Sequence, residues 1–217
     1  MSPVHYRFAI AALVLLSVTL PATADILWDQ PAGSTPAIIS TRNNALPTRS
    51  SYGFDDFQVN SGGWWEVDKV TLYGAGGLLP ASVHLAFPAT PNATSITTTY
   101  AGTVVGGNLE FNLGGMKFYS GNYWLSGFIV RGGQGSSNWT WKTRQQAQLG
   151  PAWWHNPGGY YGVGTNPIQI NTLLGHQGHE GDFAFRIEGK DVPEPGTFAL
   201  LGLGLAGLIV YRRRKTS

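Results

Sequence analysis

Two apolar runs at opposite ends of the 217-residue chain bracket a middle segment of different composition. Phe8–Leu20 is mostly apolar, and Phe198–Val210 contains no charged residue. Between them Gly, Pro and Asn recur so often that no stretch of helical length carries a 3.6-residue apolar stripe. The folded domain must therefore lie in the middle and be built from short extended segments joined by turns.

The N-terminal run has the organisation of a secretory signal peptide. Arg7 gives it a weakly positive start, and Ala22 and Ala24 are the small residues at which such peptides are cleaved. An N-terminal membrane helix is the alternative, but the run is short and ends in Pro21. We expect residues 1–24 to be a signal helix that is removed.

The C-terminal run ends in four consecutive cations, Arg212, Arg213, Arg214 and Lys215. As a helix the run would reach only about 21 Å, short of a hydrocarbon core of ~30 Å. The long basic side chains extend it at the interface, and such cations stay on the cytoplasmic side. We expect a transmembrane anchor over residues 197–211, with the four cations as its stop. A buried core helix is the alternative.

Val192, Pro193, Glu194 and Pro195 stand directly before this run. The order of Pro-Glu-Pro, apolar run and basic end resembles the PEP-CTERM sorting domain of exported bacterial proteins. The resemblance implies that an exosortase-type membrane protease recognises the Pro-Glu-Pro residues and removes the span, so that the inner membrane is a transient anchor. It also implies a Gram-negative host that makes extracellular polysaccharide, and a final location on the cell surface or in the extracellular (biofilm) matrix.

The charge of the middle segment differs from that of the whole chain. The chain has 14 Lys and Arg and 12 Asp and Glu, but five of the cations lie in the terminal segments. One of the acids, Glu194, also lies outside, so residues 25–191 keep 9 Lys and Arg against 11 Asp and Glu and carry a net charge of about −2. The basic balance of the whole chain therefore gives no support for a nucleic-acid partner. The chain has no cysteine, so its export brings no disulfide framework.

Strand signals recur along the middle segment. Phe183–Glu188 alternates large apolar residues with small or charged ones, which is the period of a strand with one buried face. Other extended segments are predicted at Ser51–Asn60, Trp65–Tyr73, Ser82–Phe87, Ile96–Ala101, Asn108–Leu113, Met116–Tyr119, Tyr123–Val130, Asn138–Thr143 and Ala152–His155, with a turn at 61–63. This spacing predicts an all-β fold, an antiparallel β-sandwich of jelly-roll type over residues 25–190. The signal helix (1–24) and the sorting and anchor segment (191–217) would flank it.

Several short motifs of the middle segment resemble a recurring, mostly uncharacterised β-sandwich ectodomain of PEP-CTERM proteins. The motifs are Asp55-Asp56-Phe57, Trp64, Tyr123-Trp124-Leu125-Ser126, Trp139-Thr140-Trp141 and the closing run Asp182–Gly189. The resemblance spans residues 50–190 and implies a fold and a setting, without a known reaction.

Three pairs of adjacent aromatic residues are the candidate glycan-binding groups: Trp64 and Trp65, Trp153 and Trp154, Tyr160 and Tyr161. Neighbours in a strand face opposite sides, so alternation places at most one of each pair in the core. The other is available to stack on the flat face of a sugar. Packing between loops or in a second layer of the core is the alternative.

Asp55, Asp56 and Asp182 are the candidate metal ligands, since they could meet if the first and last strands pair. Calcium sites use carboxylates and carbonyl oxygens from such loops, but no contiguous calcium-binding loop is present. We expect no resident cofactor, with Ca²⁺ at these three carboxylates as the open alternative.

The sequence predicts no catalytic residues. There is no cysteine and no Gly-x-Ser-x-Gly elbow, and the carboxylates cannot be paired as in a glycosidase. We expect a non-catalytic exported protein of the surface or of the exopolysaccharide matrix. A carbohydrate-binding module using exposed Trp and Tyr residues is the alternative, and a glycan hydrolase is the third.

Overall fold

Most of the described chain is β-strand. The computed structural model describes residues 24–33, 37–132, 136–144, 148–175, 181–193, 196 and 202–204. Within the described part of the ectodomain, helix is confined to the short turns η1 (Pro47–Arg49), η2 (Ala93–Ser95) and α1 (Ile170–Leu173). The predicted all-β, antiparallel class is therefore confirmed.

Fourteen strands lie within the described residues. They are β1 (Asp25–Gln30), β2 (Ala37–Ile39), β3 (Thr41–Arg42), β4 (Tyr52–Leu72), β5 (Gly74–Gly76), β6 (Pro80–Ala86), β7 (Tyr100–Ala101), β8 (Thr103–Val105), β9 (Asn108–Arg131), β10 (Trp139–Arg144), β11 (Trp153–His155), β12 (Ile168–Gln169), β13 (Asp182–Phe183) and β14 (Phe185–Pro193). Among these strands, β3 and β9 form the one parallel pair.

Two long strands, β4 and β9, form the centre of the structure. They pair antiparallel from Asp55 opposite Leu125 to Leu72 opposite Leu109. The prediction of a turn at 61–63 between two separate strands is wrong, because β4 continues through these residues with an irregularity in register. The partner strand β9 runs alongside without a break, so the inter-strand pairing resumes beyond the bend.

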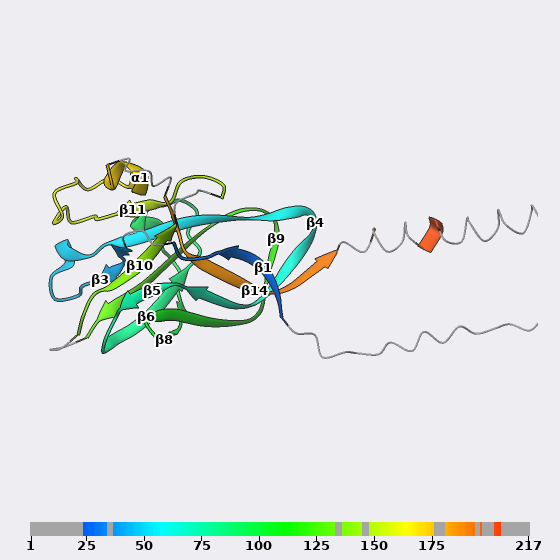
Figure 1. The fold of residues 1–217 in the computed structure, drawn as a ribbon, viewed down its shortest axis with the longest axis horizontal. Coiled ribbons are helices and arrows are strands. Elements are labelled where there is room, and N and C mark those ends of the chain that lie inside the picture. The colour runs from blue at the N-terminus through cyan, green and yellow to red at the C-terminus, as the bar shows by residue number, and fades with distance from the viewer. Residues whose placement is uncertain are drawn as a thin grey trace, which may run out of the picture.

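The two halves of this ribbon have different neighbours (Figure 1). Residues 63–72 of β4 pair with β14, and β1 pairs with β14 in turn. Residues 52–54 of β4 pair with β11, while the second half of β9 pairs with β6 and β3. A second, smaller sheet has β10 at its centre, with β2 on one edge and β5 and β13 on the other.

The apolar sides of the two ribbon halves face each other and form the core. The ring of Phe57, in the first half of β4, stacks on that of Trp65, in the second half, at 6.1 Å between centroids. Gly127 leaves the space that Leu72 fills, since a Cβ at position 127 would overlap Leu72 Cδ1. Packing between curled antiparallel layers is what the predicted sandwich requires; the jelly-roll order of its strands stays a prediction.

Trp139 and Trp141 extend this core beneath the smaller sheet. Their two-residue spacing in β10 puts both on one side, and both are fully buried. Each indole N–H donates a 2.8 Å hydrogen bond to a backbone carbonyl, of Gly107 and Ala184 respectively. These two fully buried indoles therefore carry no unpaired polar atom.

β1 and β14 bring the two ends of the ectodomain together. Asp25, at the start of β1, lies opposite Gly189 in β14. In Figure 1 the end of β14 points away from the side of the molecule that carries β3 and β11. The predicted signal helix lies outside the described residues except for Ala24, and so does the predicted anchor except for residues 202–204. In the part of the chain that the structure describes, no helix is both long and apolar enough to span a bilayer.

Candidate functional site

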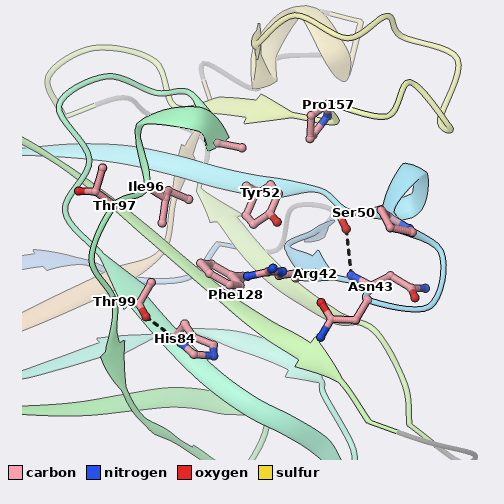
Figure 2. A pocket seen from close by; sticks show the side chains of 13 residues that line it. Arg42, Asn43, Ser50, Tyr52, His84, Ile96, Thr97, Thr99, Phe128 and Pro157 are labelled. Carbon is pink, nitrogen blue, oxygen red and sulfur yellow. Dashed lines mark hydrogen bonds between the residues drawn. The ribbon is translucent and has the colours of Figure 1, made fainter.

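A cavity of about 770 Å³ opens between β3, β6, β9, the start of β4 and the segment around η2 (Figure 2). Its lining is mainly polar: amides, hydroxyls, one imidazole and one guanidinium surround the rings of Tyr52 and Phe128. No carboxylate is among the described side chains that line it. The cavity is therefore a polar, partly aromatic site of local positive charge.

The base of the cavity is aromatic. Phe128 is 2% exposed, and its ring packs edge to face with Tyr52 at 5.0 Å and stacks with His84 at 5.3 Å. His84 and Phe128 are direct cross-strand partners in β6 and β9. Ring pairs at this spacing stabilise neighbouring strands, so the three rings hold β4, β6 and β9 together beneath the cavity.

His84 is held as a neutral imidazole. Its Nε2 lies 2.7 Å from Ser82 Oγ and its Nδ1 lies 3.0 Å from Thr99 Oγ1. Burial lowers the pKa of His84, and the positive charge of Arg42 lowers it further. Near pH 7 the ring therefore offers one donor and one acceptor, and the two hydroxyls complement them.

Arg42 is the only charged side chain among the described residues that line the cavity. It ends β3, it is exposed, and Figure 2 shows it beside Phe128. Burial raises the pKa of Tyr52, and the charge of Arg42 opposes that shift. None of the three ion pairs among the described residues includes Arg42. Its guanidinium therefore faces the cavity region without a carboxylate partner.

His155 positions one wall of the cavity. It is 3% exposed, and its Nδ1 accepts a 3.0 Å hydrogen bond from the backbone N–H of Ala93 in η2. Its Nε2 donates to the carbonyl oxygen of Thr165 at 2.9 Å. Burial lowers the pKa of His155, with the Thr165 bond opposing the shift. The neutral Nε2–H form therefore ties η2 to β11.

Asn156 positions the opposite wall. It is 1% exposed, and its Nδ2 donates to the carbonyl oxygens of Ser50 at 2.7 Å and Thr48 at 3.1 Å. Its Oδ1 accepts from the backbone N–H of Tyr161 at 3.1 Å. This one amide therefore fixes the η1 segment, which borders the cavity, relative to the loop that carries Tyr161.

The structure divides each predicted aromatic pair of the two tryptophan motifs. Trp65 and Trp154 are buried at 5% and 3% exposure, whereas Trp64 and Trp153 are half-buried. The ring of Trp64 lies 6.3 Å from that of Tyr119. In this structure only Trp64 and Trp153 of the four retain an accessible part.

The two tyrosines lie next to one of the tryptophans. Tyr161 contacts Trp154 edge to face at 5.5 Å and Tyr160 at 5.2 Å. Tyr160 is 51% exposed, and the guanidinium carbon of Arg49 lies 4.3 Å from the centre of its ring. The structure thus brings Trp154, Tyr160 and Tyr161 together near η1. Trp64 and Trp65 lie apart from them, in the half of β4 that pairs with β14.

The three candidate metal ligands lie together. Asp55 and Asp182 are fully buried and Asp56 is half-buried. Asp55 Oδ2 accepts the backbone N–H of Phe183, which follows Asp182, at 2.7 Å. Among the described residues, no group of three or more His, Cys, Asp or Glu side chains is arranged to hold a metal ion. Ca²⁺ binding stays a prediction.

Burial dominates the titration of these acids. It raises the pKa of Asp55 well above its usual range, and the charge of Asp182 adds to the shift. Burial raises the pKa of Asp182 to about 7, opposed by the hydrogen bond from the Gln148 N–H and reinforced by the charge of Asp56. The pair therefore tends to retain a proton in conditions in which exposed carboxyls are charged.

Nothing in the sequence marks the cavity residues as a set. Arg42, Tyr52, His84 and Phe128 come from four strands and share no motif. The extended segments at Ser82–Phe87 and Tyr123–Val130 were predictable, but their pairing, which places His84 against Phe128, was not. Strand register depends on contacts between segments that are distant in the chain, so no single segment carries a signal that identifies this site.

The predicted sorting motif begins inside the last strand. Val192 and Pro193 end β14, opposite Trp64 and Gly63 of β4. Glu194, Pro195 and the four terminal cations lie outside the described residues, as does the predicted cleavage residue Ala22.

Comparison with protein families identifies the PEP-CTERM protein-sorting motif at residues 191–215. This motif implies export across the membrane to the surface of a Gram-negative bacterium and sorting by exosortase, a membrane protein. Comparison with curated proteins and with solved structures gives no match.

Proposed function

We propose that this chain is a non-catalytic protein of the cell surface or of the exopolysaccharide matrix, carried there by its sorting motif. The single observation that carries the proposal is the motif at residues 191–215, which begins within the last three residues of β14 of a folded β ectodomain. On this proposal the ectodomain, a sandwich of jelly-roll type, is the part that remains outside, and the exosortase-type protease is its processing partner.

The placement of the acids supports a non-catalytic role. Asp55 and Asp182 are fully buried, so neither carboxylate reaches a substrate at the surface. Ser82 and His84 are hydrogen-bonded, but the second ring nitrogen of His84 meets the hydroxyl of Thr99 in place of a carboxylate. In the Ser-His-Asp triad a buried carboxylate orients the base, and this group has none.

The sorting proposal is tested by truncation after Pro193. Removing residues 194–217 leaves all of β14 in place and takes away the rest of the motif after Pro193, with the apolar run and the terminal cations. We expect the variant to be lost from the surface and matrix fractions of the host. Lys190→Ala, on an exposed position of β14, is the matched control and should be sorted normally. Unchanged surface and matrix amounts after truncation would refute the proposal.

Carbohydrate binding is the second candidate function, favoured by the exposed aromatic surface of Tyr160 beside Arg49. Tyr160→Ala, Trp64→Ala and Trp153→Ala each remove a ring that is at least partly accessible. Leu78→Ala is the control, since Leu78 is 66% exposed and carries no ring. Loss of retention on the host's exopolysaccharide with the Tyr160 variant would support this function, and equal retention of all four variants would exclude these rings.

A glycan hydrolase is the third possibility, and one assay separates it from the other two. Incubation of the purified full-length chain with host exopolysaccharide should release no new reducing ends. Release that disappears on substitution of a carboxylate, such as Glu66→Gln or Glu110→Gln, would replace the non-catalytic proposal.

A further inference from the structure

We propose that the cavity between β3, β6 and β9 binds an acidic sugar residue of a polysaccharide, with Arg42 meeting its carboxylate. This inference rests on the second candidate function, carbohydrate binding, and gives it a site and a ligand class that the aromatic pairs do not supply. The volume of about 770 Å³ lies within the range of small-ligand sites, so it has room for part of an oligosaccharide.

Charge is the first argument. Arg42 is the one charged group of the described lining and takes part in none of the ion pairs among the described residues. A guanidinium presents a planar pair of N–H donors that matches a carboxylate in two parallel hydrogen bonds. Since the rest of the ectodomain carries a net negative charge, an anion is attracted to this place by the local cation and by little else.

The neutral groups around Arg42 suit sugar hydroxyls. Thr97 and Thr99 are exposed, and each hydroxyl can both donate and accept. Asn43 uses its backbone N–H and its Oδ1 within its own loop, toward Ser50 Oγ and the N–H of Leu46. Its amide NH₂ makes no hydrogen bond within the described residues and so remains a donor for a ligand. Hydroxyls and amides around one cation suit a ligand with many hydroxyls and a single charge.

The aromatic base supplies the apolar contact. The ring of Tyr52 is half-buried against Phe128, so one part of it faces the cavity. The C–H face of a sugar ring packs on such a surface. A phosphate ligand fits less well, because phosphate sites combine several cations or a helix N-terminus with backbone N–H groups. The described lining of this cavity has one cation, Arg42.

Binding is measured by titration calorimetry on the purified full-length chain. The probes are tetragalacturonate, oligomers of glucuronate and mannuronate, the methyl ester of tetragalacturonate, and inorganic phosphate. The ester keeps the sugar rings and removes the charge. We expect at least one uronate oligomer to bind, and the methyl ester of tetragalacturonate to bind roughly tenfold or more weakly than its acid if that is the ligand.

Arg42→Ala should weaken uronate binding roughly ten- to a hundredfold, the effect of losing a hydrogen bond between charged groups. Arg42→Lys should fall in between, because an ammonium keeps the charge and loses the planar pair of donors. Arg49→Ala is the matched control: it removes an exposed arginine beside Tyr160, outside the cavity lining, and should leave affinity unchanged. Circular dichroism and the thermal midpoint establish that each variant is folded.

Three outcomes would overturn the inference, and they differ in what else they affect. If Arg49→Ala weakens binding and Arg42→Ala does not, the site is the Tyr160 surface and carbohydrate binding stands. If phosphate binds as tightly as the uronates, with the same loss in Arg42→Ala, the cavity is a general anion site. If no uronate oligomer binds, the inference fails, while carbohydrate binding is decided separately by retention on the host's exopolysaccharide and the sorting proposal is unaffected.

Discussion

The side-chain amide of Gln30 donates a 3.2 Å hydrogen bond to Oδ2 of Asp182, a residue 152 positions later in the chain. Both side chains are fully buried, and the second oxygens of both, Gln30 Oε1 and Asp182 Oδ1, have no hydrogen-bond donor among the described residues. One proton on Asp182 Oδ1 would supply the missing donor, giving a neutral acid beside an amide. The raised pKa of Asp182, about 7, is consistent with such a proton.

This pair predicts an unusual dependence of stability on pH. Asp182 titrates near 3.8 when exposed and at about 7 in the folded chain, so the folded state binds the proton more tightly. Its stabilising contribution is complete below about pH 4 and is lost as pH rises through 7. We expect the free energy of unfolding from Asp182 to fall by roughly 2–4 kcal/mol across this window. Urea unfolding at pH 4.5 to 8 measures it.

Asp182→Asn removes this contribution, together with the part of the Asp55 pKa shift that the charge of Asp182 causes. The side-chain oxygen of an asparagine can still accept from the Gln148 N–H, and its NH₂ group takes the place of the unpaired Oδ1. The variant should therefore be more stable than the parent chain at pH 8 and about equally stable near pH 4. His84 and His155 have lowered pKa values, so their contribution to stability rises with pH, opposite to that of Asp182. Both chains contain these histidines, so the difference between the unfolding free energies of variant and parent removes their contribution. Asp191→Asn, at an exposed position, is the control. A parent–variant difference that does not change with pH would contradict the assignment.

Gly127→Ala should destabilise the core by about 3 kcal/mol. The new Cβ would overlap Leu72 Cδ1 at the contact between the two layers, and neither strand can move away because β4 and β9 are paired with each other and with further strands. Thermal unfolding of the variant checks this.

The double variant Gly127→Ala, Leu72→Ala tests the cause. Leu72→Ala alone should cost about 2–5 kcal/mol through the cavity it leaves. In the double variant the added methyl has room, so the combined loss should be smaller than the sum of the single losses by at least about 1 kcal/mol. Strict additivity would show that the overlap is relieved elsewhere.

Asn156→Asp should loosen the cavity while keeping the size of the side chain. In the variant a carboxylate oxygen replaces the Nδ2 that donates to the carbonyl oxygens of Ser50 and Thr48. The two carbonyl oxygens then face another acceptor and lose their donor. Because the site is buried, we expect a loss of about 2 kcal/mol and faster proteolysis within residues 43–50. Asn166→Asp, at an exposed position, should change neither measurement. Unaltered proteolysis in Asn156→Asp would show that the loop is held by other contacts.

Local periodicity explains which parts of the fold were predictable. The alternation in Phe183–Glu188 predicts one extended segment, which the structure divides between the end of β13 and the start of β14, and the spacing of Trp139 and Trp141 predicts a shared buried face. The glycines at 62 and 63 predict a turn, because a local rule cannot know that β9 continues alongside and carries β4 through the bend. Pairing with the distant strand β9 is therefore the reason why residues 62 and 63 lie within a strand and not in a turn between two strands.

The candidate site follows the same division. Adjacency of Trp64 with Trp65 and of Trp153 with Trp154 predicts that at most one of each pair lies in the core, and the structure shows that Trp65 and Trp154 do. The cavity depends on Arg42 reaching Phe128 from a two-residue strand that pairs parallel to β9. A strand of two residues has no periodicity, so its partner and the exposed arginine at its end are decided by tertiary packing alone.

Asp29→Asn should release the first strand from the edge of the sheet. Arg186 in β14 donates from Nε and Nη2 to the two carboxylate oxygens of Asp29 in β1, at 3.1 and 3.0 Å. Both groups are about one-third exposed, so the loss of global stability should be only about 0.5–1 kcal/mol and should shrink at high salt.

Local opening of β1 in Asp29→Asn should increase more than this global loss indicates, since the Asp29–Arg186 pair lies where β1 covers the strand that leads into the sorting motif. Hydrogen exchange of β1 amides measures this opening, and we expect several-fold faster exchange in low salt. Lys117→Gln breaks a longer pair with Glu66, at 3.8 Å, and should leave β1 exchange as it is. Equal exchange in Asp29→Asn and Lys117→Gln would show that backbone pairing alone holds β1 in place.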